Sequence, residues 1–333
     1  MDPLTTLAPP ASQVGNGADQ HWEQTYQALL DAYEQAGGIA AVLQSPYLAS
    51  LIMNGEQVLE MHSVPGVHLA IERQPIGVTI HITVEPYTVV DQPLYLCLGM
   101  LDPQGVQHIT TRYDIGAHAR VAVLVYWLFP HAQKVDHMPD TAMHIGPDAT
   151  LVYTETHYHG CTAGVRAVPQ IQICVAERGQ YIGTLNLDQG NAGHFKLDCH
   201  AHVGNQGLVN LTTRIYGTDN DDIWVQKNVH LNGNGARGML NTRIAARDQA
   251  HSRVYTTIVG HAAGACGHID CAAIIHGQAM AESMPRVVIH HSQARVTQAA
   301  TVGGVNECEL ERLVAQGLDV DTALDMLMQE MLA

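Results

Sequence analysis

The chain has 333 residues, with 16 Lys and Arg against 32 Asp and Glu, so its formal net charge is −16. This acidic balance disfavours nucleic acid and anionic membranes as main partners, and no uncharged apolar run approaches the ~20 residues of a membrane span. Seven cysteines without a C-x-x-C spacing argue against a disulfide framework or a closed zinc site and favour a reducing cytoplasm.

The N-terminal part predicts a short helical region after a polar tail. Residues 1–18 are rich in Pro, Ala, Gly, Ser and Asn, which is typical of a flexible tail. From Asp19 onward a helix is expected, because apolar residues recur at i, i+4, i+7 and i+8. These residues are Trp22, Tyr26, Leu29, Leu30 and Tyr33. We therefore assign residues 19–57 to an N-terminal helical region.

Residues 58–303 have the period of two that indicates β-strands. In residues 78–84 Val and Ile alternate with Thr and His, and residues 121–128 form an apolar run typical of a buried strand. Turn signals separate many short strands, and no helical pattern interrupts them. A sandwich, a barrel and a β-solenoid all fit, and the even rhythm of small residues favours the solenoid.

The last segment, residues 304–333, returns to helical periodicity. Asn306 is a predicted N-cap with Glu309 three residues later, and Gly317 is placed to end this helix. Asp319 begins a second helix with a broad apolar stripe. Such a helical hairpin packs either on the chain's own β-core or on another subunit.

The stretch Gly267-His268-Ile269-Asp270-Cys271 places an imidazole, a carboxylate and a thiol in one strand. Because side chains alternate along a strand, His268 and Asp270 share one face, and Ile269 and Cys271 share the other. Cys271 is therefore expected to point inward with the apolar residues. The pattern alone favours a buried structural cysteine over a functional one.

Short motifs follow one another in a specific order over roughly residues 93–333. They are Leu96-Cys97-Leu98-Gly99, Phe129-Pro130-His131-Ala132, Tyr153-Thr154-Glu155-Thr156-His157-Tyr158-His159-Gly160, Arg237-Gly238-Met239-Leu240, Gly267-His268-Ile269-Asp270-Cys271, Met284-Pro285-Arg286-Val287, Ala294-Arg295-Val296-Thr297, and Gly317-Leu318 with Ala323. Together they resemble the SufB/SufD family, the scaffold proteins of the SUF iron–sulfur cluster assembly system, and in particular its short archaeal-type members.

The resemblance implies a right-handed parallel β-helix between helical ends, in a scaffold rather than an enzyme. It implies that the terminal hairpin docks SufC, an ABC-type ATPase, and that two SufB/SufD-type subunits pair through the β-helix as a homodimer or with a paralogue. Cys271 is the position that matches the sulfur acceptor of SufB, so a transient iron–sulfur cluster is the implied cofactor. The residues expected to contact the ATPase are Leu310, Leu313, Gly317, Leu318, Ala323 and Leu327.

The chain departs from the SufB pattern at Gln298 and Ala299, where SufB-like members carry His and Glu. An amide and a methyl group thus replace two side chains that can bind iron. One alternative is a scaffold that uses other ligands, for which Cys266, His268 and His251 are nearest in sequence to Cys271. The other is a structural, SufD-like partner without a cluster of its own.

Two further polar groups are candidate metal ligands. Glu155, His157 and His159 alternate, so they share one strand face, which is either a metal site or a solvent-exposed polar face of the solenoid. A second group consists of Cys199, His200 and His202. The chain lacks the G-x-x-x-x-G-K-[ST] motif, so we expect it to bind no nucleotide itself.

A remote alternative is a β-helix enzyme that acts on polysaccharide. Such an enzyme needs paired carboxylates at catalytic spacing on one exposed face. The only dense acidic group is Asp219, Asp221 and Asp222, which lies in a predicted turn.

Overall fold

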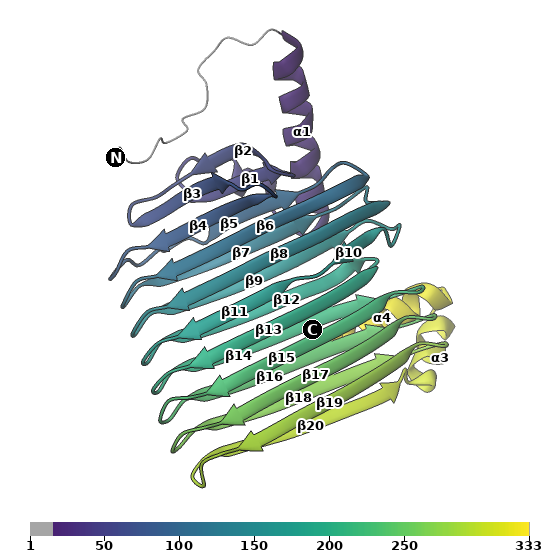
Figure 1. Cartoon of the computed structure of the whole chain (residues 1–333). Coiled ribbons are helices and arrows are strands. Elements are labelled where there is room, and N and C mark those ends of the chain that lie inside the picture. Colours follow the sequence, from purple (N-terminus) through teal and green to yellow (C-terminus); the bar gives the residue numbers. More distant parts are fainter. Residues whose placement is uncertain (1–15, 333) are drawn as a thin grey trace.

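The computed structural model describes residues 16–332. Most of the predicted tail, residues 1–15, lies outside this range. Helix α1 (Asn16–Gln35) begins three residues before the start expected at Asp19, and α2 (Ala40–Leu43) follows it. The remainder consists of stacked strands and a C-terminal pair of helices (Figure 1).

The strands form two sheets of ten strands each, which we call sheet A and sheet B. In spatial order, sheet A contains β2 (Gln57–His62), β1 (Ser50–Asn54), β5 (Leu94–Gly99), β7 (Arg120–Leu128), β9 (Thr150–His159), β12 (Gln180–Gly190), β14 (Leu208–Gly217), β16 (Arg237–Ala246), β18 (Cys266–Ile275) and β20 (Arg295–Gly304). Sheet B contains β3 (Val67–Arg73), β4 (Val78–Val84), β6 (Gln104–Ile115), β8 (Lys134–Ile145), β10 (Val165–Ala167) with β11 (Gln170–Val175), β13 (His194–Val203), β15 (Asp222–Leu231), β17 (His251–Gly260) and β19 (Met280–Ile289).

These sheets are the two faces of a parallel β-solenoid, as the sequence predicted. From β5 onward the chain alternates between sheet A and sheet B, apart from the short β10–β11 pair, and strands within each sheet pair in parallel. Asp222 pairs with His251 and His251 with Met280, so one turn of the solenoid takes 29 residues there. Among the strands of the described residues, only β1–β2 and β3–β4, at the N-terminal end, pair antiparallel.

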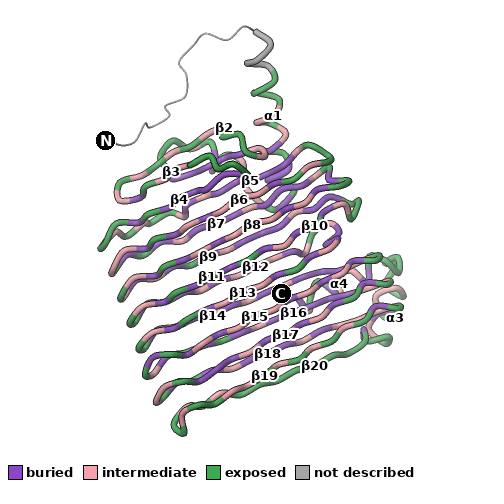
Figure 2. Tube along the Cα trace, in the orientation of Figure 1, coloured by how far each residue is buried: buried purple, intermediate pink, exposed green. Residues whose placement is uncertain are grey.

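Alternation along each strand separates the core from the surface. In β15 the inward residues Ile223, Val225, Lys227, Val229 and Leu231 are buried, and the outward residues that alternate with them are half-buried. The same alternation runs through both sheets, so the main hydrophobic core lies between them (Figure 2). Apolar burial at roughly 25 cal/mol per Å² is therefore gained anew in every turn.

One corner of the solenoid uses a left-handed residue in successive turns. His118, Asp148, Arg178 and Gln206 all have φ between 53° and 60°. This conformation costs a non-glycine residue about 1–2 kcal/mol. Each of these residues donates its backbone N–H to the corner of the next turn, as His118 does to the carbonyl of Pro147 at 2.9 Å. These hydrogen bonds stack the corners in register.

Helices cover part of sheet A. Helix α1 packs over β5 and β7, and α4 (Val320–Leu332) packs over β14 and β16 next to α3 (Glu307–Ala315). The predicted caps of the terminal hairpin are confirmed: Asn306 Oδ1 accepts from the Glu309 N–H at 3.4 Å, and Asp319 Oδ1 accepts from the Thr322 N–H at 3.0 Å.

The C-terminal end of the solenoid is uncovered by any part of the chain that the structure describes. On β18 the inward residues Ile269 and Cys271 are buried. Their register partners on β20, Gln298 and Ala300, are exposed. Figure 2 shows β20 as largely exposed along its length. The last turn therefore presents its inward face and its strand edges to solvent.

Candidate functional site

Cys271 lies inside the solenoid, as strand alternation predicted. Its side chain points inward from β18 and is only 2% exposed. The Sγ atom lies 3.8 Å from Thr256 Oγ1, which comes from the facing sheet. His268 and Asp270 point outward from the same strand, where His268 Nδ1 lies 2.7 Å from Thr297 Oγ1. The imidazole and carboxylate therefore do not act on the thiol beside them in sequence.

The structure does not bring the expected iron ligands together. Cys271 is internal, His268 is on the outer face of sheet A, and Cys266 is exposed at the first position of β18. His251 occupies the first position of β17 on sheet B. A strand of ten residues is about 30 Å long, so His251 and Cys266 lie near opposite ends of one turn. This four-residue ligand set is not assembled.

A buried lysine, Lys227, lies beside Cys271 in the interior. Its Nζ donates to Thr213 Oγ1 and to the Asn241 carbonyl, both at 3.0 Å. Burial lowers the pKa of this ammonium to about 8, and the nearby thiols of Cys271 and Cys199 act in the opposite direction. Lys227 is thus a buried cation whose charge interacts with two of the buried cysteines, Cys271 and Cys199.

Register explains why these groups meet. On sheet B, Cys199, Lys227 and Thr256 occupy one inward column of paired strands. On sheet A, Thr213, Thr242 and Cys271 occupy the column that faces them. The two columns make a polar line across this part of the core. Burial raises the pKa of Cys199 to about 12, against the attraction of Lys227.

A small cavity of about 30 Å³ lies beside this polar column. It is large enough for one water molecule and is lined by Glu155, Cys199, Thr213 and Lys227 among others. An ammonium group favours thiolate over thiol, and thiolate is the nucleophilic form of sulfur. At Cys199 burial outweighs this attraction, so that thiol stays protonated.

Glu155, His157 and His159 share one face of β9, as predicted, but that face points into the solenoid. The alternative of a solvent-exposed polar face is therefore wrong. Glu155 accepts hydrogen bonds from Trp127 Nε1 and Tyr153 OH, both at 3.0 Å, and lies 2.8 Å from His157 Nε2. The buried carboxylate is satisfied by these three partners.

A third histidine, His137 of β8, completes an interior imidazole cluster. Its ring centroid lies 5.9 Å from that of His157, which lies 5.5 Å from that of His159. Burial lowers the pKa of His159 to about 3 and that of His137 well below its usual value. These two rings are neutral at physiological pH.

Within residues 16–332, no group of three or more His, Cys, Asp or Glu side chains is arranged to hold a metal ion. The metal role of Glu155, His157 and His159 stays a prediction. The second candidate group is divided: Cys199 points inward, whereas His200 and His202 lie on the outer face of sheet B. His200 Nε2 is 3.0 Å from Asp198.

The acidic turn has a structural role. Asp221 is buried and its carboxylate accepts the backbone N–H groups of Ala192, Gly193 and Thr218 at 2.7–2.9 Å. Asp219 accepts instead from the Asn191 side-chain amide at 2.7 Å. These hydrogen bonds hold neighbouring corners of the solenoid together, and the carboxylates do not form a catalytic pair.

Sequence reasoning missed Lys227, although a signal was present. In residues 223–231 every second residue is apolar except Lys227. A lysine at an inward position of a buried strand is rarely tolerated without partners. That break in the alternation marks the polar column.

Comparison with known proteins finds relatives that cover most of this chain. The chain is 27% identical to an iron–sulfur cluster assembly SufBD family protein of Pyrococcus horikoshii over 307 residues, which cover 92% of this chain and 93% of the relative. It is 28% identical to a SufBD family protein of Methanocaldococcus jannaschii over 85% of this chain and 89% of the relative. These similarities support the SufB/SufD family. No family model matches the chain.

Each of these two alignments covers most of this chain and most of the relative. A second SufBD family protein of P. horikoshii is 29% identical over 169 residues, half of this chain. No helix within residues 16–332 is long and apolar enough to span a membrane.

Proposed function

We propose that this chain is a scaffold subunit for iron–sulfur cluster assembly, which pairs with a second SufB/SufD-type subunit and docks an ABC-type ATPase. The names of its relatives support the role in assembly. The observation that carries the pairing is the uncovered last turn of the solenoid, and the terminal hairpin supports the docking.

The uncovered turn has the properties of an association surface. Val302 of β20 is 45% exposed, and Met284 and Ile289 of β19 are exposed as well. In addition, each strand there pairs on one side only. Exposed apolar residues next to free strand edges favour association with another chain. An identical chain and a paralogue both fit this surface.

The terminal hairpin divides its apolar residues between two faces. Leu310, Ala323, Leu324 and Met328 are buried against the chain's own β-core. Of the two alternatives for the hairpin, packing on the chain's own β-core therefore applies to these buried residues. Leu310 and Ala323, which we expected to contact the ATPase, are not on the free face.

The free face of the hairpin is the proposed ATPase contact. Val320 is 55% and Met326 51% exposed, whereas Leu313, Leu318 and Leu327 are half-buried and pack against the buried cluster of the hairpin. Gly317 is exposed in the turn between α3 and α4. Exposed Met and Val on a helix surface fit an adaptable partner contact.

Two reciprocal variants test the pairing and the docking separately. Val320→Asp combined with Met326→Asp should abolish co-purification with the ATPase and leave the subunit pair intact. Val302→Asp should abolish pairing and leave ATPase binding intact. Retention of the ATPase by the first variant refutes hairpin docking, and an unchanged size of the second by light scattering refutes pairing through the last turn.

Sulfur and iron receipt is a separate step, proposed at Cys271 beside Lys227. Anaerobic reconstitution with iron and sulfide, followed by visible absorption, compares Cys271→Ser with the parent and with Cys199→Ser. Loss of cluster absorption in Cys271→Ser alone supports sulfur receipt at this thiol.

A structural, SufD-like role is the second candidate. The burial of Cys271, the unassembled ligand set, and Gln298 and Ala299 at the last turn favour it. Equal absorption of Cys271→Ser and the parent assigns the chain to that role.

A further inference from the structure

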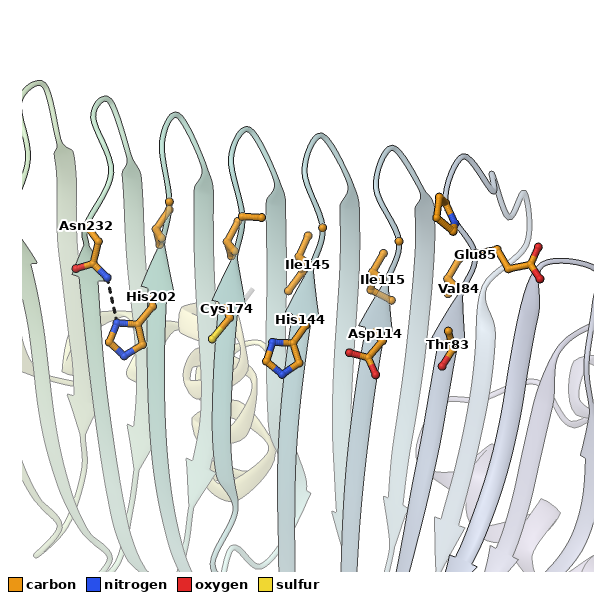
Figure 3. Close-up of a pocket in the computed structure, with 17 residues that line it drawn as sticks. Thr83, Val84, Glu85, Asp114, Ile115, His144, Ile145, Cys174, His202 and Asn232 are labelled. Carbon is orange, nitrogen blue, oxygen red and sulfur yellow. Dashed lines mark hydrogen bonds between the residues drawn. The ribbon is translucent and has the colours of Figure 1, made fainter. Parts of the chain in front are cut away.

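The last turns of the solenoid differ in charge from the rest of the chain. Residues 223–306 contain seven Lys and Arg against three Asp and Glu, although the net charge of the whole chain is −16. Figure 3 shows this change along the corner that follows the strands of sheet B, where the labelled side chains include Glu85 and Asp114 at one end and His202 and Asn232 at the other. The corners that precede β16, β18 and β20 contain no Asp or Glu. An anion that approaches them therefore meets no like charge from the corner itself.

Two exposed arginines stand on either side of a thiol at the start of three neighbouring strands. Arg237 of β16 pairs in register with Cys266 of β18, and Cys266 pairs with Arg295 of β20. All three alternate with inward residues, so they lie on the outer face of sheet A. Among the described residues, 16–332, neither guanidinium has a hydrogen bond or an ion pair. The outward carboxylate of β18, Asp270, lies four residues along the strand and is bound by Arg243 at 2.6 Å.

We propose that Arg237 and Arg295 form a binding site for a phosphate group, which they hold between them above Cys266. A guanidinium presents a rigid fork of N–H donors, and this fork matches the oxygens of phosphate. Free phosphate and a phosphomonoester carry the same group, so both belong to this ligand class. The site faces outward from sheet A and is separate from the inward face and strand edges of the last turn. It does not rest on the proposed role in assembly.

The separation of the two arginines selects the kind of anion. Neighbouring strands lie about 4.8 Å apart, so the Cα atoms of Arg237 and Arg295 are about 9.6 Å apart. A phosphate that accepts charge-assisted hydrogen bonds of about 2.8 Å on two opposite sides needs donor atoms about 8 Å apart. Long arginine side chains reach this separation above the intervening strand. A carboxylate has both oxygens on one side and fits a single fork, whereas tetrahedral phosphate accepts from both.

The exposure of the site determines how binding must be measured. Both guanidinium groups are in contact with solvent, so dissolved salt screens their attraction for an anion. The screening length is about 8 Å at an ionic strength of 0.15 M, which is similar to the width of the site. Binding should therefore weaken as ionic strength rises, and a titration requires low and constant ionic strength.

The thiol of Cys266 can report on the site because it lies between the two arginines. The parent for the experiment replaces the other exposed cysteines, Cys161, Cys174 and Cys308, by serine. Relative to neutral iodoacetamide, anionic iodoacetate should alkylate Cys266 faster than it alkylates 2-mercaptoethanol. Inorganic phosphate, exchanged against chloride at constant ionic strength, should slow alkylation by iodoacetate at least about fivefold and in a saturable manner.

Matched variants separate this site from other surface cations. Arg237→Gln and Arg295→Gln should each remove the preference for iodoacetate and the protection by phosphate. Arg120→Gln should behave as the parent, because Arg120 is the exposed first residue of β7 and has Gln180, not an arginine, two strands away. Circular dichroism should be unchanged in every variant, because the substituted side chains lie on the surface.

Comparison of anions identifies the source of the phosphate group. Stronger protection by glycerol phosphate than by inorganic phosphate assigns the site to a phosphorylated molecule, and equal or weaker protection assigns it to the free ion. Equal protection by malonate, a dicarboxylate, overturns the proposal in favour of an acidic protein partner. The proposal is also overturned by a parent without preference for iodoacetate, by protection that does not saturate, or by protection that survives both arginine substitutions.

Discussion

Replacing His159 by asparagine should make the solenoid more resistant to mild acid. His159 is buried, with Nδ1 3.3 Å from the Ala192 carbonyl and no hydrogen-bond partner for Nε2. Burial, together with the neighbouring His157, lowers its pKa from 6.5 to about 3. Asparagine keeps an N–H donor near the Ala192 carbonyl and removes the titrating ring.

The sign and size follow from proton linkage. Between pH 6.5 and 3 the unfolded chain binds a proton at this position and the folded chain does not, so the free energy of unfolding falls as the pH falls. For pKa values of 6.5 and 3 the loss is about 2 kcal/mol at pH 5, and it is negligible at pH 8. His137 acts in the same direction because burial lowers its pKa too.

Urea unfolding followed by circular dichroism at pH 8 and pH 5 measures this difference. The parent should lose about 2 kcal/mol more stability than His159→Asn over this interval. The smaller side chain destabilises the variant at both pH values, so only the pH-dependent part is diagnostic. His131→Asn, at an exposed site, should follow the parent. Parallel pH profiles for the parent and His159→Asn refute a buried neutral histidine.

Three further predictions concern stability. In the parent, the free energy of unfolding should rise by about 3 kcal/mol between pH 8 and 10.5, because the pKa of Lys227 is about 8 in the folded chain and the unfolded chain binds the extra proton. Lys227→Met should remove this rise, and equal pH slopes for the parent and the variant contradict the prediction. Arg247→Ala breaks the ion pair to Asp325 at 2.8 Å and should speed hydrogen exchange in α4 while exchange in β9 stays unchanged. Asp221→Ala leaves three backbone N–H groups unpaired and should lower the free energy of unfolding by about 3 kcal/mol, which an unchanged urea midpoint excludes.

Much of the fold could be predicted because a solenoid repeats local rules. Alternation placed Cys271 inward and His268 outward, and turn signals separated the strands. The caps at Asn306 and Asp319 depend on residues only three apart. Each of these features needs information from a few neighbouring residues, which a single sequence supplies.

The candidate site was harder to predict, because neighbouring residues alone do not decide whether a strand face points into the core or to solvent. Alternation showed that Glu155 and His159 share a face, but the second sheet decides that this face is buried. Lys227 meets Cys271 only because two registers align across the core, 44 residues apart in the chain. In contrast, Asp114, His144 and Cys174, which pair in register on β6, β8 and β11, lie 30 residues apart in succession, so the length of one turn is present in the sequence as a period.

Because the last turn is uncovered, the stability of this end depends on the concentration of any chain that binds it. Each turn of a solenoid is stabilised mainly by its neighbours, and β19 and β20 have a neighbour on one side only. These strands should therefore open first and expose the inward face of β18 to proteases. A partner that binds the folded end stabilises it by mass action. Under the proposed pairing, solitary subunits should therefore be degraded faster than paired ones.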